Sequence, residues 1–145
     1  MMSYLTLITL SLVFNNTVLV EGKGFKGYIF PKEYKNKYFE RDTDKLFTPT
    51  IENIMEVEKL LNQKSKDIKR NKLSTENKCW NYNKLCKYNR QYFGEIDENG
   101  NKMIFVNFIL KKSTPEYWNK DVVIVLDDSC DYVWTDKIKI DDVQN

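Results

Sequence analysis

The residues best suited to acid–base or metal chemistry gather near the C-terminus, where Asp127, Asp128 and Asp131 surround Cys130. Paired carboxylates serve as the acid and the nucleophile or base of many glycosidases, and they also ligate calcium. Aspartate is also common in turns. We therefore favour a turn for this cluster, and we keep a carboxylate-based hydrolase acting on cell-surface glycans as an alternative function.

A second acidic motif, Asp97-x-Asn99-x-Asn101, has the spacing with which an EF-hand calcium loop begins. The rest of that loop is missing, because Lys102 stands where the loop needs glycine and Phe108 where it needs glutamate. The same residues fit a β-hairpin turn around an Asn-Gly pair. We therefore predict a turn here and no metal site.

The sequence contains no histidine, which excludes a Ser-His-Asp triad, a Cys-His pair and imidazole metal ligands. Its three cysteines, Cys79, Cys86 and Cys130, include no C-x-x-C pair, so neither a zinc site nor another cofactor is expected. A Cys79–Cys86 disulfide would close and stabilise a short loop. That disulfide and three reduced thiols are equally good interpretations, and no catalytic residue is predicted.

The small net charge of +2 combines a basic middle with an acidic end. Residues 64–90 hold nine Lys or Arg and two Asp or Glu, whereas residues 121–145 hold two Lys and seven Asp. We favour the interpretation that these two regions lie close together and balance each other. Interleaved aromatic residues make a polyanion-binding surface the alternative. The residues of this candidate surface are Lys69, Arg70, Lys72, Lys78, Trp80, Tyr82, Arg90 and Trp118.

Hydrophobic periodicity predicts the helix that must help to position these residues. Thr48 and Pro49 fit the N-cap and the first position of an amphipathic helix that ends between Gln63 and Ile68. Its expected apolar stripe consists of Ile51, Ile54, Met55, Val57, Leu61 and Ile68.

The remaining elements are predicted to be strands, at residues 24–30, 88–96, 103–110, 122–126 and 132–140. The Asn-Gly pair predicts a hairpin between the second and third of them. Residues 122–126 are apolar on both faces and are expected to form a central strand. We predict an α+β fold in which one amphipathic helix packs on an antiparallel meander sheet of about four to five strands.

The N-terminus is predicted to be a signal peptide. Residues 4–14 form an almost unbroken apolar run, which suits the hydrophobic region of a secretory signal and is too short to span a bilayer. A buried first strand is the alternative. We expect a signal peptide at residues 1–22, cleaved near Val20 or Gly22, and a single domain at residues 23–145. The product would be secreted or periplasmic, without a membrane segment.

Several segments together carry a resemblance: YNRQYFG (88–94), DENGNKMIFVN (97–107), Trp118, VVIVL (122–126) and DDSCDY (127–132). With them the chain resembles small secreted proteins of Bacteroidetes, which implies export but no particular activity. The order of helix and then sheet also resembles a cystatin-like architecture, and architecture alone does not imply function. The Gln-x-Val-x-Gly hairpin of inhibitory cystatins is absent, so protease inhibition is not expected.

A foldable core without an assembled catalytic set predicts an exported, non-catalytic binding or structural module. Its partner would be another protein or a surface polymer, and the near-neutral charge argues against nucleic acid. Two alternatives stay open: the hydrolase described above, and a polyanion-binding module.

Overall fold

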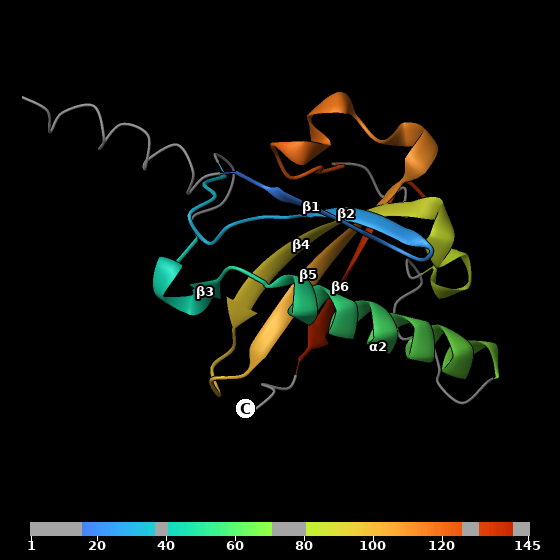
Figure 1. Cartoon of the computed structure of the whole chain (residues 1–145), viewed down its shortest axis with the longest axis horizontal. Helices are drawn as coiled ribbons and strands as arrows, with labels where there is room; N and C mark the ends of the chain where they lie inside the picture. Colours follow the sequence, from blue (N-terminus) through green and yellow to red (C-terminus); the bar gives the residue numbers. More distant parts are fainter. Residues whose placement is uncertain (1–15, 37–40, 71–80, 126–130, 141–145) are drawn as a thin grey trace, which may run out of the picture.

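The computed structural model of the chain describes residues 16–36, 41–70, 81–125 and 131–140. Within these residues the fold is α+β, and one long helix, α2 (Ile51–Lys69), covers one face of a six-stranded sheet (Figure 1). The strands are β1 (Val18–Gly22), β2 (Phe25–Ile29), β3 (Leu46–Phe47), β4 (Tyr88–Ile96), β5 (Lys102–Leu110) and β6 (Val133–Lys139). The predicted class, one helix on a mostly antiparallel sheet, is confirmed.

The strand order is β1-β2-β4-β5-β6, and the short β3 also pairs with β4. Four of these pairings are antiparallel, but β2 and β4 run parallel, with Gly27 opposite Arg90 and Ile29 opposite Tyr92. The predicted meander is therefore wrong at this pairing. Parallel neighbours need a crossover connection, and α2 lies in the segment of chain that links β2 to β4.

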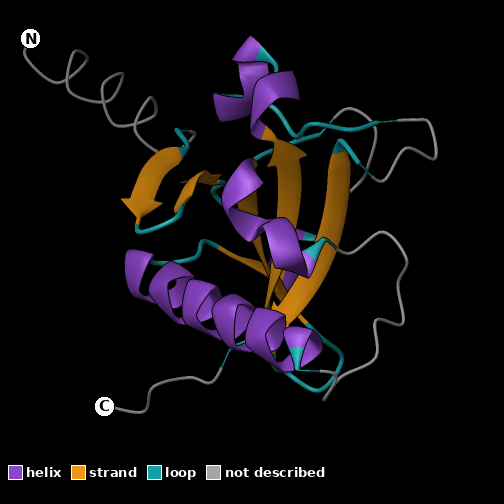
Figure 2. Ribbon diagram, turned by 90° about the vertical axis from the view of Figure 1, so that its right-hand side faces the viewer, coloured by secondary structure: helices purple, strands orange, loops and turns teal. Residues whose placement is uncertain are grey.

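Residues 122–125 do not form a strand, although their apolar character predicted one. They follow the 3-10 helices η3 (Lys111–Ser113) and η4 (Glu116–Asn119), on the side of the sheet away from α2 (Figures 1 and 2). The Val123 amide donates to Gln91 Oε1 at 2.9 Å, and Asn107 Nδ2 donates to the Val123 carbonyl at 2.9 Å. These two strand side chains pair both backbone groups of Val123, which a neighbouring strand would otherwise have to do.

Helix α2 begins later than predicted, with Thr50 as its N-cap. Thr50 Oγ1 accepts from the Asn53 amide at 3.1 Å, and Asn53 Oδ1 accepts from the Thr50 amide at 2.9 Å. This reciprocal pair is a capping box, which satisfies two backbone donors that the first turn leaves unpaired. Thr48, the predicted cap, instead accepts from the Lys32 amide at 3.0 Å and ties the helix approach to the segment after β2.

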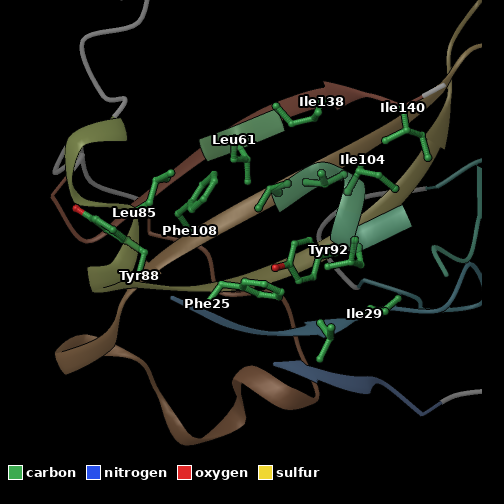
Figure 3. Packing of buried hydrophobic residues seen from close by; sticks show 14 of the residues in the cluster. Phe25, Ile29, Leu61, Leu85, Tyr88, Tyr92, Ile104, Phe108, Ile138 and Ile140 are labelled. Atoms are coloured by element: carbon green, nitrogen blue, oxygen red, sulfur yellow. The ribbon is translucent and has the colours of Figure 1, made fainter. Parts of the chain in front are cut away.

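The hydrophobic core lies between α2 and the sheet (Figure 3). Ile54, Val57 and Leu61 have no exposed surface, whereas Ile51 and Met55 are 52% and 50% exposed. At about 3.6 residues per turn, the last two lie on the flank of the helix and not over the sheet. The strands contribute aliphatic and aromatic side chains, among them Phe25, Ile29, Tyr92, Ile104, Phe108, Trp134 and Ile138.

The hairpin between β4 and β5 is confirmed. Gly100 adopts a φ of 79° in its turn, and the Asp97 carboxylate accepts from the Asn99 and Asn101 amides at 2.9 and 2.8 Å. The hydrogen bonds from Asn101 and Asn99 lower the pKa of Asp97. The residues that resemble the start of a calcium loop thus serve the turn.

Strand β1 overlaps the predicted signal peptide. It pairs antiparallel with β2, and its Val20 side chain belongs to the core. The predicted domain boundary after Gly22 therefore falls in the turn of the β1–β2 hairpin, while the apolar run at residues 4–14 lies outside the described residues. None of the helices within the described ranges has the length and hydropathy that a bilayer-spanning segment requires.

Candidate functional site

The strongest candidate for a binding site is a groove at one end of the β4–β5 hairpin, which we call the basic groove. Its cavity volume is about 580 Å³. Four of its lining residues are lysines. The full lining consists of Asn81, Lys84, Cys86, Lys87, Tyr88, Leu110, Lys111, Lys112 and Asp131.

The hairpin brings the lysines together. Tyr88, the first residue of β4, pairs with Leu110, the last residue of β5. The 3-10 helix η2 (Tyr82–Lys87) ends immediately before Tyr88, and η3 begins immediately after Leu110. Because the two arms of the hairpin are equally long, the lysines of η2 and those of η3 lie at the same end of the sheet.

Tyr88 fixes the floor of the basic groove. Its side chain is only 3% exposed, and its hydroxyl donates to the Asp131 carbonyl at 3.0 Å. The same hydroxyl accepts from Asn81 Nδ2 at 3.0 Å. These two bonds attach the segment before η2 and the segment before β6 to the end of the hairpin.

The four lysines Lys84, Lys87, Lys111 and Lys112 are exposed. None of their ammonium groups forms an ion pair with a carboxylate of the described residues. Asp131 is the one carboxylate in the described lining. The groove therefore presents a concentration of positive charge to solvent, which attracts anionic groups and exchanges its counterions for them.

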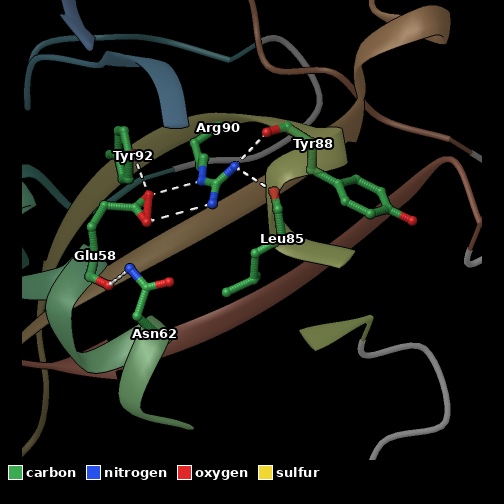
Figure 4. A network of polar contacts seen from close by, with 6 residues as sticks. All are labelled: Glu58, Asn62, Leu85, Tyr88, Arg90 and Tyr92. Carbon is green, nitrogen blue, oxygen red and sulfur yellow. Dashed lines mark hydrogen bonds and ion pairs between the residues drawn. The ribbon is translucent and has the colours of Figure 1, made fainter. Parts of the chain in front are cut away.

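Arg90, which the sequence placed on a binding surface, is instead buried, with 1% of its surface exposed. Its Nε donates to Glu58 Oε1 at 2.8 Å, and its Nη1 donates to the Leu85 and Tyr88 carbonyls (Figure 4). Tyr92 also donates to Glu58 Oε1, at 2.8 Å. Strand alternation could have revealed this placement, because Tyr88, Arg90 and Tyr92 point to the same face of β4.

Tyr82 is the second predicted surface residue that is buried, with 2% of its surface exposed. Its ring lies 5.4 Å from that of Trp134, and its hydroxyl donates to the Asp136 carboxylate. Burial, followed by the neighbouring Asp136, raises the pKa of Tyr82. An aromatic side chain in the core is not available to stack on a ligand.

The other members of the predicted surface are dispersed. Lys69 and Arg70 are exposed at the C-terminal end of α2. Trp118 packs edge-on against Tyr28 of β2, with ring centroids 4.6 Å apart, and it does not line the basic groove. The predicted residues Lys72, Lys78 and Trp80 lie outside the described residues.

The predicted chemistry of the cysteines and aspartates falls mostly on segments that the structure does not describe. Cys86 is exposed and forms no disulfide with another of the described residues. Cys79 lies outside the described residues, so the Cys79–Cys86 disulfide stays a prediction. Asp127, Asp128 and Cys130 also lie outside them, and Asp131 is exposed. In the described part of the chain, no three His, Cys, Asp or Glu residues are grouped to hold a metal ion.

Comparisons with protein-family models, with curated proteins and with solved structures found no match. Sequence reasoning missed the lysines of the basic groove. The signal that could have found them is the pair of equal hairpin arms, each flanked by lysine at the same end.

Proposed function

We propose that the chain is an exported, non-catalytic binding module whose basic groove holds an acidic glycan of the cell surface. The observation that carries the proposal is the convergence of Lys84, Lys87, Lys111 and Lys112 without an ion-pair partner among the described residues. Lysine ammonium groups act as hydrated point charges on flexible stems, which suits sulfate or carboxylate groups repeated along a polymer.

The lining of the groove favours a glycan over a single-stranded nucleic acid. Proteins that bind single strands stack bases on exposed aromatic rings. Tyr88 is the one aromatic residue in the described lining, and it is 3% exposed with its hydroxyl engaged in two hydrogen bonds. The groove therefore offers charge without a stacking platform.

The same lining favours binding over catalysis. A glycosidase of the common type needs two carboxyl groups about 5–10 Å apart. Asp131 is the one carboxylate in the described lining of the groove, so the described residues supply no second member of such a pair. Export, the resemblance to small secreted proteins of Bacteroidetes and the cystatin-like architecture stay parts of the proposal.

Retention on immobilised heparin, a sulfated glycan, tests the proposal. We expect a variant with glutamine at Lys84, Lys87, Lys111 and Lys112 to elute at much lower salt than the wild type. The slope of log affinity against log salt, which is negative, should become shallower by about 3, as expected when about four charge contacts are lost. Circular dichroism would show that the variant is folded.

A matched control carries the same loss of charge elsewhere on the surface. It replaces the exposed residues Lys23, Lys32, Lys45 and Lys59 with glutamine, and it should keep most of the retention. Equal losses in both variants would show that net charge, and not the groove, holds the polymer. Flow-through of the wild type at low salt would overturn the proposal, as would turnover of the glycan by the wild type.

A further inference from the structure

A second hollow lies on the sheet face that α2 does not cover, and we call it the aromatic hollow. Its volume is about 300 Å³. Phe93 and Phe105 pair across β4 and β5, and they face away from Tyr92 because side chains alternate along a strand. The hollow is lined by Tyr34, Asn36, Arg41, Phe93, Glu95, Phe105 and Val122, and it shares no residue with the basic groove.

Arg41 is the cation of this hollow. Its guanidinium carbon lies 5.8 Å from the centre of the Tyr34 ring and 5.5 Å from that of the Phe93 ring. Its Nη1 donates to the Tyr34 carbonyl at 3.1 Å. No carboxylate of the described residues forms an ion pair with it. A guanidinium has five N–H donors, so most of its hydrogen-bonding capacity is unused by the described protein groups.

The Arg41 guanidinium is partly buried without an ion-pair partner among the described residues. This is unusual, since charges removed from water are normally paired. Loss of hydration lowers the pKa of Arg41, and the charge of Glu95 acts in the opposite direction. Glu95 lines the hollow, but its Oε2 lies 3.2 Å from Lys137 Nζ, so that ion pair offsets part of its charge. Arg41 therefore has a nearby anion without a direct contact to it.

The other polar groups of the hollow are occupied. The Tyr34 hydroxyl donates to Asp121 Oδ1 at 2.7 Å and accepts from the Val122 amide at 3.0 Å. These bonds fix the ring of Tyr34 against the segment that follows η4. The hollow is thus a set of fixed aromatic walls around one cation with unused donors.

We propose that the aromatic hollow binds a small carboxylate with a flat, apolar body. The carboxylate would accept two parallel hydrogen bonds from the Arg41 guanidinium, which matches its geometry. The ring of the ligand would pack against the half-buried ring of Phe105, because Phe93 is itself only 6% exposed. The volume lies at the lower end of the range for ligand pockets, which indicates a single-ring ligand. This site is independent of the proposed glycan groove.

Titration of the folded chain with phenylacetate, followed by amide chemical shifts, tests this proposal. We expect saturable shifts around Arg41, Phe93 and Phe105. Phenylacetamide, which has the same ring and no charge, should bind at least tenfold more weakly, and acetate, which has no ring, should also bind at least tenfold more weakly. Equal affinity for phenylacetate and phenylacetamide would overturn the proposal, and so would the absence of saturable shifts with phenylacetate. These comparisons use the wild type and do not depend on any variant folding.

Two substitutions are expected to change the affinity for phenylacetate in opposite directions. Arg41→Gln should weaken phenylacetate binding at least tenfold, whereas Glu95→Gln should strengthen it about twofold, because a nearby negative charge is removed. A Glu95→Gln variant that loses binding would show that the hollow selects cations, which contradicts the proposal. Lys84→Gln in the basic groove should leave phenylacetate binding unchanged, so failure of one site can be distinguished from failure of the other.

Discussion

The Nε of Arg90 lies 2.8 Å from Oε1 of Glu58, and the two side chains are 2% and 4% exposed. This ion pair joins strand β4 to helix α2 inside the core. The Tyr92 hydroxyl donates to Glu58, and the Leu85 and Tyr88 carbonyls accept from Arg90. A buried pair of this kind fixes how the helix lies on the sheet, because any other arrangement would leave a charge without a partner.

We expect Arg90→Met to destabilise the fold by about 3–5 kcal/mol, because it leaves the Glu58 carboxylate buried without its cation. The double variant Glu58→Leu with Arg90→Met should recover much of that loss, since apolar side chains replace both charges. Urea unfolding of the two single variants and the double variant measures the coupling. If the losses of the single variants simply add, the two residues are not energetically linked.

Gln91 is expected to hold the segment after η4 on the sheet. Its Nε2 donates to the Trp118 and Asp121 carbonyls at 2.7 and 2.8 Å, and its Oε1 accepts from Asn107 Nδ2 and the Val123 amide. Gln91→Met keeps the approximate shape and removes all four bonds. We expect a loss of about 3 kcal/mol of stability, from several buried groups left unpaired.

Hydrogen exchange gives this prediction a local readout, because the Val123 amide should exchange much faster in the variant. Gln63→Met is the matched control, since Gln63 is exposed on α2 and bonds only to Asp67 among the described residues. Unchanged protection at Val123 in Gln91→Met would show that the segment is held by other contacts.

Ionisation of the Tyr34 phenol is expected to reduce the stability of the fold at alkaline pH. Burial raises the pKa of Tyr34 to about 12, whereas a tyrosine in an unfolded chain ionises near pH 10. Folding therefore favours the protonated phenol. Its contribution is complete below about pH 10 and is lost as the pH rises toward about 12. Tyr34→Phe should make the free energy of unfolding fall less steeply across that window.

The measurement is a series of urea midpoints between about pH 9 and 12, the window set by the two pKa values. The buried phenols of Tyr82 and Tyr92, whose pKa values are also raised by burial, should preserve part of the slope in the variant. Tyr117→Phe serves as the control at an exposed position. A Tyr34→Phe variant with the same slope as the wild type would contradict the prediction.

The position of β1 predicts where a signal peptide could be cleaved. Because Val18–Gly22 forms β1 and Val20 is in the core, we expect that, if the chain is exported as proposed, the mature form retains β1. Mass spectrometry of the exported protein should therefore place its first residue before Val18. Recovery of a folded chain that begins at Lys23 would contradict this expectation and support the cleavage position expected from the sequence.

A chain that starts at Lys23 can also be compared with one that starts at Asn16. We expect the shorter chain to unfold at lower urea concentration, because it loses the Val20 side chain and leaves β2 as an unpaired edge. Equal stability would show that β1 contributes little to the fold.

The local parts of the fold were predictable from the sequence, and the long-range parts were not. The Asn99-Gly100 pair specified the β4–β5 hairpin because both positions tolerate its turn. By contrast, residues 122–125 have the composition of a strand. Their backbone is instead paired by distant side chains, those of Gln91 and Asn107 at Val123 and that of Tyr34 at Val122.

The candidate sites were harder to predict for the same reason. Arg90 looked like a surface residue because its partner, Glu58, lies on another element. The lysines of η2 and η3 look like ordinary exposed lysines until the register of the hairpin places them together. Nothing in the sequence indicated a site at Arg41, because its aromatic neighbours Tyr34 and Phe93 come from different segments.

The parallel pairing of β2 with β4 also has a consequence for the order in which the chain folds. β4 and β5 meet through a local turn, whereas β2 reaches β4 only after the chain around α2 has closed on itself. Closing that long loop costs conformational entropy before the contacts between β2 and β4 can offset it. The β1–β2 hairpin is therefore expected to dock last. Until it does, the part of β4 from Arg90 to Tyr92 has an open edge, available to any other strand that can pair with it.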